Sequence, residues 1–171
     1  MKLEANPNDW SCLPTAFATA VGREAAWMIR QIGHDGSSTP YKDKEFRAGF
    51  HEQECIEVLQ RFGYACTPIE AVPAISPTGS LDEYRLIYFG EDEMVSNIER
   101  FKRHLEGSCG VLTGVYIRGA KTVGHAVAWD GAEQQIYDPN LGGRVYPFED
   151  ASKFGFTPRC YWKVQYVKAH G

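Results

Sequence analysis

The sequence has few of the features that mark metal-binding, membrane or secreted proteins. Its five cysteines form no C-x-x-C pair, the spacing typical of zinc sites, so we expect no metal. No apolar run approaches the roughly 20 residues of a membrane-spanning helix, so no membrane partner is expected. The first residues, Met-Lys-Leu-Glu-Ala-Asn-Pro, lack the apolar core of a signal peptide. With an odd number of cysteines, this predicts a cytoplasmic protein.

The charge pattern excludes one further class of partner. The net charge is −4 and no basic stripe is visible, so nucleic acid is not expected as the main partner. The chain also contains no internal repeat and no low-complexity segment. Its 171 residues, of which 43% are hydrophobic, are ordinary for a globular protein and predict a single domain over residues 1–171.

Helical and strand periodicities occupy different parts of the chain. Apolar residues recur at helical spacing in four segments, which are predicted helices: 12–22, 24–32, 50–62 and 92–106. Alternation typical of strands dominates after position 109. The predicted strands are 64–69, 86–89, 110–117, 125–129, 134–137, 144–147 and 160–167; the segments 34–44, 72–82, 140–143 and 152–158 are predicted loops. Helices followed by antiparallel strands predict an α+β fold, with the N-terminal helices packed on one antiparallel β-sheet.

One cysteine, Cys12, stands at the start of the first predicted helix. Ser11 is a suitable N-cap, and Pro14 fits the first turn, where its missing N–H has no intrahelical partner to lose. The positive end of the helix dipole favours the thiolate, which is the nucleophilic form of cysteine. The other cysteines have apolar neighbours and are interpreted as small core residues: Cys55, Cys66, Cys109 and Cys160.

A nucleophilic cysteine needs a base, and the base needs an orienting group. His125 is predicted to open a strand directly after Gly124, which leaves space beside it. If the following hairpin turns near Gly131 and Ala132, Tyr137 or Asp138 returns level with His125. The carboxylate of Asp138 could then hold the imidazole in the required tautomer. Asn140 is the alternative orienting residue.

Side-chain amides are available just before the cysteine. Asn6 or Asn8, together with the backbone N–H of Cys12, could stabilise an oxyanion. Trp10 either lines a substrate groove or covers the core. Two other histidines, His34 in a loop and His104 on the polar side of a helix, are expected to face solvent.

These motifs resemble the papain-like cysteine peptidases, most closely the compact bacterial branch that includes the leader-peptide-cleaving domains of bacteriocin exporters. The matching segments are Cys12-Leu-Pro-Thr-Ala-Phe-Ala, Gly124-His-Ala-Val-Ala-Trp and Ile136-Tyr-Asp-Pro, and the order of elements is similar over most of the chain. The resemblance implies a papain-like fold, a Cys12–His125–Asp138 triad and no cofactor. In that family an amide residue six positions before the cysteine completes the oxyanion hole. That position is Asn6 here, where the family usually has glutamine.

The resemblance implies a peptidase that hydrolyses a peptide or isopeptide bond in a peptide or protein substrate, with Trp10 and Gly124 beside the substrate. Two alternatives stay open. The same triad could serve a transferase or a deamidase, because a fold does not fix the acceptor. The chain could also be a non-catalytic papain-fold binding or structural component of a bacterial or phage assembly.

Overall fold

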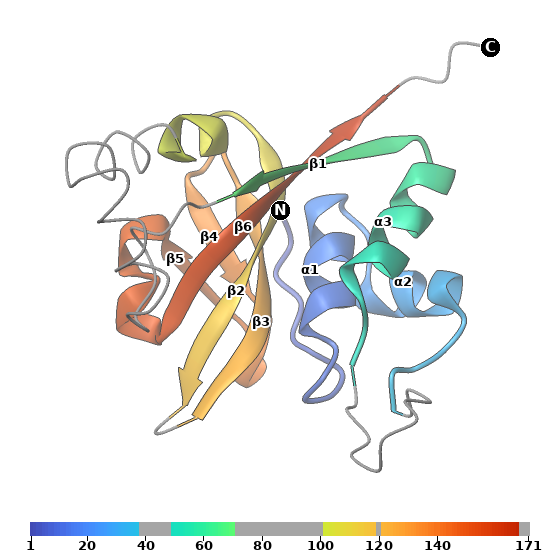
Figure 1. Cartoon of the computed structure of the whole chain (residues 1–171), viewed down its shortest axis with the longest axis horizontal. Helices are drawn as coiled ribbons and strands as arrows, with labels where there is room; N and C mark the ends of the chain where they lie inside the picture. The colour runs from blue at the N-terminus through green and yellow to red at the C-terminus, as the bar shows by residue number, and fades with distance from the viewer. Residues whose placement is uncertain (38–48, 71–100, 119–120, 168–171) are drawn as a thin grey trace, which may run out of the picture.

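The computed structural model describes residues 1–37, 49–70, 101–118 and 121–167 (Figure 1). The N-terminal part contains α1 (Cys12–Ala20), α2 (Ala25–Ile32) and α3 (Glu52–Arg61). The strands are β1 (Tyr64–Glu70), β2 (Cys109–Arg118), β3 (Lys121–Asp130), β4 (Gln135–Asp138), β5 (Arg144–Pro147) and β6 (Phe156–Tyr166). Short 3-10 helices cover Asn140–Gly142, Phe148–Asp150 and Ser152–Phe154.

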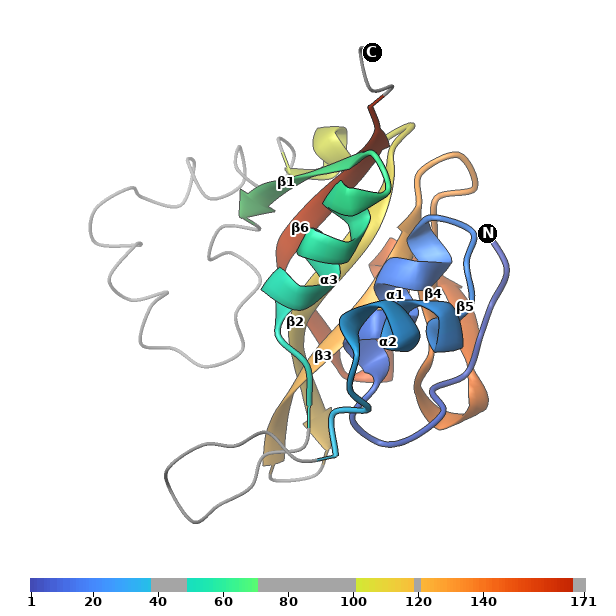
Figure 2. The same cartoon turned by 90° about the vertical axis from the view of Figure 1, so that its right-hand side faces the viewer.

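The strands form one antiparallel sheet in the order β1-β6-β2-β3-β4-β5. In the view turned by 90°, the three helices cover one face of this sheet (Figure 2). The predicted α+β arrangement is therefore confirmed. Within the described part of the chain, no helix is long and apolar enough to cross a membrane.

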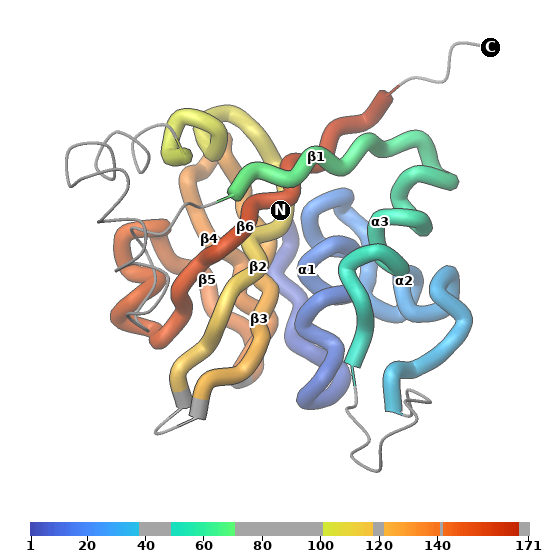
Figure 3. The backbone as a smooth tube through the Cα atoms, in the orientation of Figure 1, coloured from blue at the N-terminus to red at the C-terminus, as the bar shows by residue number. Residues whose placement is uncertain are grey.

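Helix α1 is the most buried of these helices, since all residues from Leu13 to Thr19 are buried. It contacts β2 and β3 on one side and α2 and α3 on the other, as the backbone trace shows (Figure 3). Its sequence, CLPTAFATA, has no charged side chain, so burial on all sides leaves no charge without water. Its first residue, Cys12, is thereby fixed by tertiary packing.

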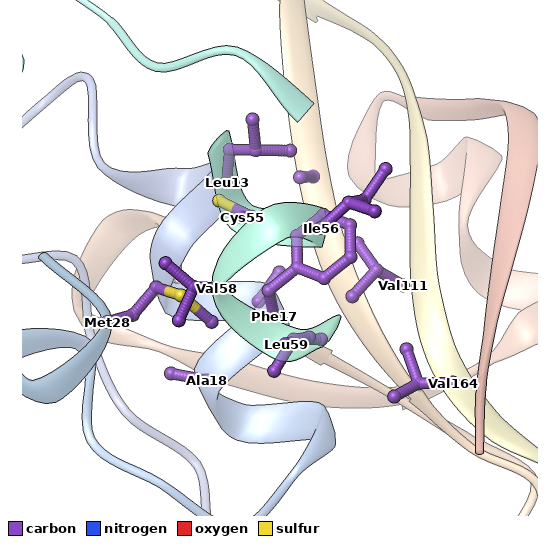
Figure 4. Packing of buried hydrophobic residues seen from close by; sticks show 12 residues of the cluster. Leu13, Phe17, Ala18, Met28, Cys55, Ile56, Val58, Leu59, Val111 and Val164 are labelled. Carbon is purple, nitrogen blue, oxygen red and sulfur yellow. The ribbon is translucent and has the colours of Figure 1, made fainter. Parts of the chain in front are cut away.

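The core has two parts, one on each side of the sheet. Between the helices and the sheet, Phe17 of α1 packs with Leu59 of α3 and Val111 of β2 (Figure 4). A second cluster on the other face includes Val127 and Tyr161, both fully buried. Because both faces of the central strands are covered, these strands are held rigidly enough to position side chains for chemistry.

The strand predictions differ from the structure in two places. His125 was expected to open its strand, but β3 begins four residues earlier at Lys121 and pairs with β2 along its whole length. Strand β6 begins at Phe156 rather than Cys160 and includes Pro158. The register between β2 and β6 shifts between Thr113 and Gly114, directly beside this proline. Such a bulge is where a strand tolerates a residue that lacks an N–H.

Two expectations about side chains also require correction. The interpretation of the four other cysteines as core residues holds for Cys55, which is fully buried, whereas the remaining three, Cys66, Cys109 and Cys160, are partly exposed. His34 was expected to be only solvated, but its Nε2 lies 2.8 Å from Glu54 Oε1 and its ring stacks on Phe50. This links the segment after α2 to the start of α3. His104 is exposed, as expected.

Several predicted elements lie partly or wholly outside the described residues. The expected helix 92–106 is described from Phe101 onward, where residues 101–105 are helical and Phe101 and Leu105 are buried, as expected. The predicted loop 72–82, the predicted strand 86–89 and most of the loop 34–44 lie outside the described residues.

Two strand glycines provide a test of this packing. A Cβ at Gly114 would collide with the carbonyl oxygen of Thr157 on β6, whereas a Cβ at Gly124 would meet no atom within 4 Å. We expect Gly114→Ala to lower the free energy of unfolding by about 1–3 kcal/mol, because β2 and β6 must separate. Gly124→Ala should change it by less than about 1 kcal/mol. Urea denaturation measures both, and equal effects would contradict this description of the sheet.

Candidate active site

The site is built around a hydrogen bond between two buried side chains on neighbouring strands. His125 Nε2 of β3 lies 2.8 Å from Asp138 Oδ1 at the end of β4. The His125 side chain is 4% exposed and the Asp138 side chain 2%, so little water competes with this contact. The rings of Tyr116 and Phe156 meet the imidazole edge-on, each with its centroid 5.6 Å away. The imidazole is therefore held in one orientation.

The register shows how Asp138 reaches His125. Ala128 faces Tyr137 and Trp129 faces Ile136, so continuing the ladder would set Asp138 opposite Val127. The sequence led us to expect Asp138 directly opposite His125. In the structure it lies two residues further along the same face of the sheet. Diagonal neighbours of this kind remain within reach of long side chains in an antiparallel sheet.

Two further donors hold the Asp138 carboxylate. The backbone N–H of Asn140 donates to Oδ1 at 2.9 Å, and the Tyr146 hydroxyl on β5 donates to Oδ2 at 3.0 Å. Asn140 was the alternative partner of His125; it instead contacts the carboxylate through its backbone. A buried charge with three donors avoids the large cost of an unpaired one.

Tyr146 is the residue of this site that sequence reasoning missed. It faces Ile136 across the β4–β5 ladder, which makes it another diagonal neighbour of Asp138. The signal was present, since an inward-facing tyrosine in the predicted strand 144–147 needs a partner for its hydroxyl. Only the register shows that this partner is the carboxylate of Asp138.

Cys12 completes the group from the helical side. It is the first residue of α1, is partly exposed, and interacts closely enough with His125 to raise its pKa by hydrogen bonding and charge. Because Nε2 of the imidazole is bonded to Asp138, Nδ1 is the nitrogen left for the thiol. Three side chains that are far apart in the sequence therefore meet in one row.

The electrostatics of the row favour a charged imidazole. Burial alone would lower the pKa of His125, but hydrogen bonds to Asp138 and Cys12 and the negative charges of both outweigh it and raise the pKa to about 9. Burial would likewise raise the pKa of Asp138, but the hydrogen bond and charge of His125 hold it below its usual range. At neutral pH an imidazolium thus stands beside the sulfur of Cys12.

The loop before Cys12 is organised by Asn8. Its Oδ1 accepts hydrogen bonds from the Trp10 N–H at 3.1 Å and the Ser11 hydroxyl at 2.6 Å. Ser11 is the N-cap residue of α1, as expected, but its side chain makes no capping hydrogen bond. The first backbone N–H groups of α1, including that of Cys12, are therefore not bonded to the side chain of the N-cap residue and can donate to another acceptor. Asn8 thus has a structural role in this loop.

Asn6 and Trp10 occupy opposite ends of the same loop. The Asn6 N–H donates to the Pro139 carbonyl at 2.9 Å, next to Asp138. Asn6 Oδ1 is buried and has no hydrogen-bond partner among the described residues. The Trp10 indole N–H donates to the Asp35 carbonyl at 2.9 Å and ties this loop to the segment after α2. Gly124 is exposed and lies beside open space, as expected.

A comparison of the sequence with protein-family models gives no match, and a comparison with curated proteins gives none either. Among the described residues, no group of three or more His, Cys, Asp and Glu side chains could hold a metal ion.

The raised pKa of His125 can be measured directly. We expect its ring resonances to titrate near pH 9 in NMR spectra, and Asp138→Asn to move the midpoint down because burial then acts with less opposition. Cys12→Ala should move it down as well. The stability due to this shift is fully present below pH 6.5 and is lost as the pH rises through about 9. A midpoint near 6.5 in all three proteins would contradict the described row.

The role of Tyr146 can be tested at acid pH. Tyr146→Phe leaves Asp138 Oδ2 buried without this donor, which should cost about 1–3 kcal/mol of unfolding free energy near neutral pH. The pKa of Asp138, now depressed, should also rise. Its contribution to stability is lost as the pH falls through that pKa, so acid unfolding should begin at a higher pH. Tyr166→Phe, at a 68% exposed position, is the control and should change neither quantity.

Proposed function

We propose that the chain is a papain-like cysteine peptidase that hydrolyses a peptide or isopeptide bond. The observation that carries the proposal is the row formed by Cys12, His125 and Asp138, which come from the start of α1, from β3 and from the end of β4. A helix-borne cysteine facing a sheet-borne histidine is the arrangement that the sequence resemblance implies. The same arrangement supplies all the groups that nucleophilic acyl transfer needs.

In the first half of the reaction the Cys12 thiolate attacks the carbonyl carbon of the scissile bond. The C=O electron pair moves onto oxygen and gives a tetrahedral oxyanion. The protonated His125 then gives its proton to the leaving nitrogen, the C–N bond breaks, and an amine departs. The acyl group is left as a thioester on Cys12.

In the second half water completes the hydrolysis. The neutral His125 takes a proton from the water molecule as it attacks the thioester carbonyl. The C–S bond then breaks, the carboxylic acid is released, and the thiolate and imidazolium are restored. Asp138 keeps the imidazole oriented and stabilises its positive charge in both halves, without itself taking the proton.

Two donors near Cys12 suit the oxyanion. The backbone N–H of Cys12 is free of a side-chain cap, and the positive end of α1 favours negative charge at this point. Asn6 lies beside the turn after Asp138, and its amide is the second donor in this proposal. Thiolate, imidazole and amide groups are sufficient for this chemistry.

Selective alkylation tests the nucleophile. With iodoacetamide near pH 6, we expect Cys12 to react at least about tenfold faster than any other cysteine, because only thiolates react. Burial raises the pKa of Cys66 and Cys160 to about 11 and also raises those of Cys55 and Cys109. His125→Ala should abolish the selectivity. Slow, uniform labelling in both proteins would favour the non-catalytic binding component instead.

Product analysis with the wild-type chain and its variants distinguishes a peptidase from a transferase and a deamidase. A peptide library derived from a bacterial proteome should acquire new N-termini, detected by mass spectrometry, with the wild-type chain and not with Cys12→Ala. Asp138→Asn should lower turnover by about 10²-fold or more while the fold is retained. Acyl groups found on an added amine, or glutamine converted to glutamate without cleavage, would establish the transferase or the deamidase instead.

A further inference from the structure

Arg144, the first residue of β5, lies directly beside the proposed active site. In the β4–β5 ladder it is paired with Asp138, and directly opposed residues of an antiparallel pair have their side chains on the same face of the sheet. Tyr146, two residues further along β5, shares this face and donates its hydroxyl to Asp138. A cationic side chain therefore starts opposite the carboxylate that orients the imidazole of His125.

The guanidinium of Arg144 forms no ion pair with Asp138, whose two oxygens already accept hydrogen bonds from other donors. It lies instead over the ring of Phe154, 5.4 Å from the centroid. The Phe154 ring is in turn 4.5 Å from the Tyr146 ring, centroid to centroid. Among the residues that the structure describes, no ion pair includes Arg144, which is partly exposed. The aromatic contact thus holds a cation whose N–H donors can bind a ligand.

The turn before β5 connects this cation to the cysteine side of the site. The Asn6 N–H donates to the Pro139 carbonyl, and a Cβ at Gly143 would touch the side chain of Leu3. The segment before α1 therefore runs along the turn between β4 and β5. Both lie at the same end of the molecule in the view turned by 90° (Figure 2). Since β5 begins there, Arg144 stands at the end of the sheet where the proposed triad meets.

The proposed reaction gives this end of the sheet to the leaving side of the substrate. The leaving nitrogen takes its proton from the imidazole, so the residues that follow it lie on the side of His125 and Asp138. A peptide advances by at most about 3.6 Å per residue, and opposed residues of an antiparallel ladder are about 5 Å apart at Cα. A group one or two residues beyond the scissile bond is therefore within reach of the long Arg144 side chain.

We propose that Arg144 is a specificity-determining residue that binds a carboxylate of the substrate, one or two residues beyond the scissile bond. The planar guanidinium matches the two oxygens of a carboxylate, and a peptide carries this group on Asp and Glu side chains and at its C-terminus. The substrate class is then a peptide with negative charge just after the cleaved bond. This inference rests on the proposed peptidase function.

The cleavage sites in a proteome-derived peptide library provide the first test. In the wild type we expect a carboxylate one or two residues after the cleaved bond at least about fivefold more often than its frequency in the library, because charge-assisted hydrogen bonds are strong. Enrichment of Asp and Glu within peptides identifies the side-chain carboxylate. Cleavage that is confined to sites near the C-terminus, and is lost when the C-termini are amidated, identifies the terminal carboxylate.

A matched pair of peptides then measures the contact with Arg144. The two peptides share the preferred site and differ only in carrying Glu or Gln there, or a C-terminal acid or amide. We expect kcat/KM to be at least about tenfold higher for the charged peptide in the wild type, and this ratio to fall to about 1 in Arg144→Gln. Arg144→Lys keeps the charge but loses the fork, so its ratio should be intermediate. A purely structural role would lower kcat/KM for both peptides and leave the ratio unchanged.

The matched control is Arg23→Gln. Arg23 also lies over an aromatic ring, that of Trp27 at 5.6 Å, but it follows the end of α1 opposite Cys12. This variant should keep the wild-type ratio. A wild-type ratio in Arg144→Gln, or a wild type that cleaves without preference for a carboxylate, would overturn the inference and leave the peptidase intact. A wild type that yields no new N-termini would overturn the proposed function and the inference with it. Urea denaturation verifies that Arg144→Gln is folded.

Discussion

The Asp138 carboxylate joins the three strands of the site and fixes their relative positions. Asp138 is the last residue of β4. Its carboxylate is hydrogen-bonded to the imidazole of His125 on β3 and accepts a hydrogen bond from the Tyr146 hydroxyl on β5. A carboxylate buried to 2% exposure is stable only while these donors stay in place. The same contacts that make the carboxylate tolerable therefore also orient the base, so the structural and the proposed chemical requirements coincide at one residue.

Helix α1 supplies the complementary half of the site by a different kind of force. It carries no charge and is covered on all sides, so apolar packing around residues such as Phe17 sets the position of Cys12. Polar contacts act at its start, where Asn8 organises the turn that precedes it. The nucleophile is thus positioned by packing, and the base by hydrogen bonds.

The sequence predicted elements better than it predicted contacts. Periodicity located α1, α2, α3 and most strands, since their apolar patterns are local properties. It did not reveal the start of β6, because the bulge that accommodates Pro158 depends on the partner strand. The pairing of His125 with Asp138 followed from motif order, but Tyr146 and the diagonal geometry required the register. The contact of His34 with Glu54 likewise depends on how α2 and α3 pack, which no local pattern records.

The unequal burial of the two sides of the site has a consequence for local opening. Amides in α1 are covered by sheet and helices, so their hydrogen exchange should require opening of the core. The end of the β2–β3 hairpin, with Ile117 and Val123 exposed, has far less holding its backbone closed. This end of the hairpin can therefore open locally without disturbing the helix that carries Cys12, so its opening and the position of the sulfur are energetically separate.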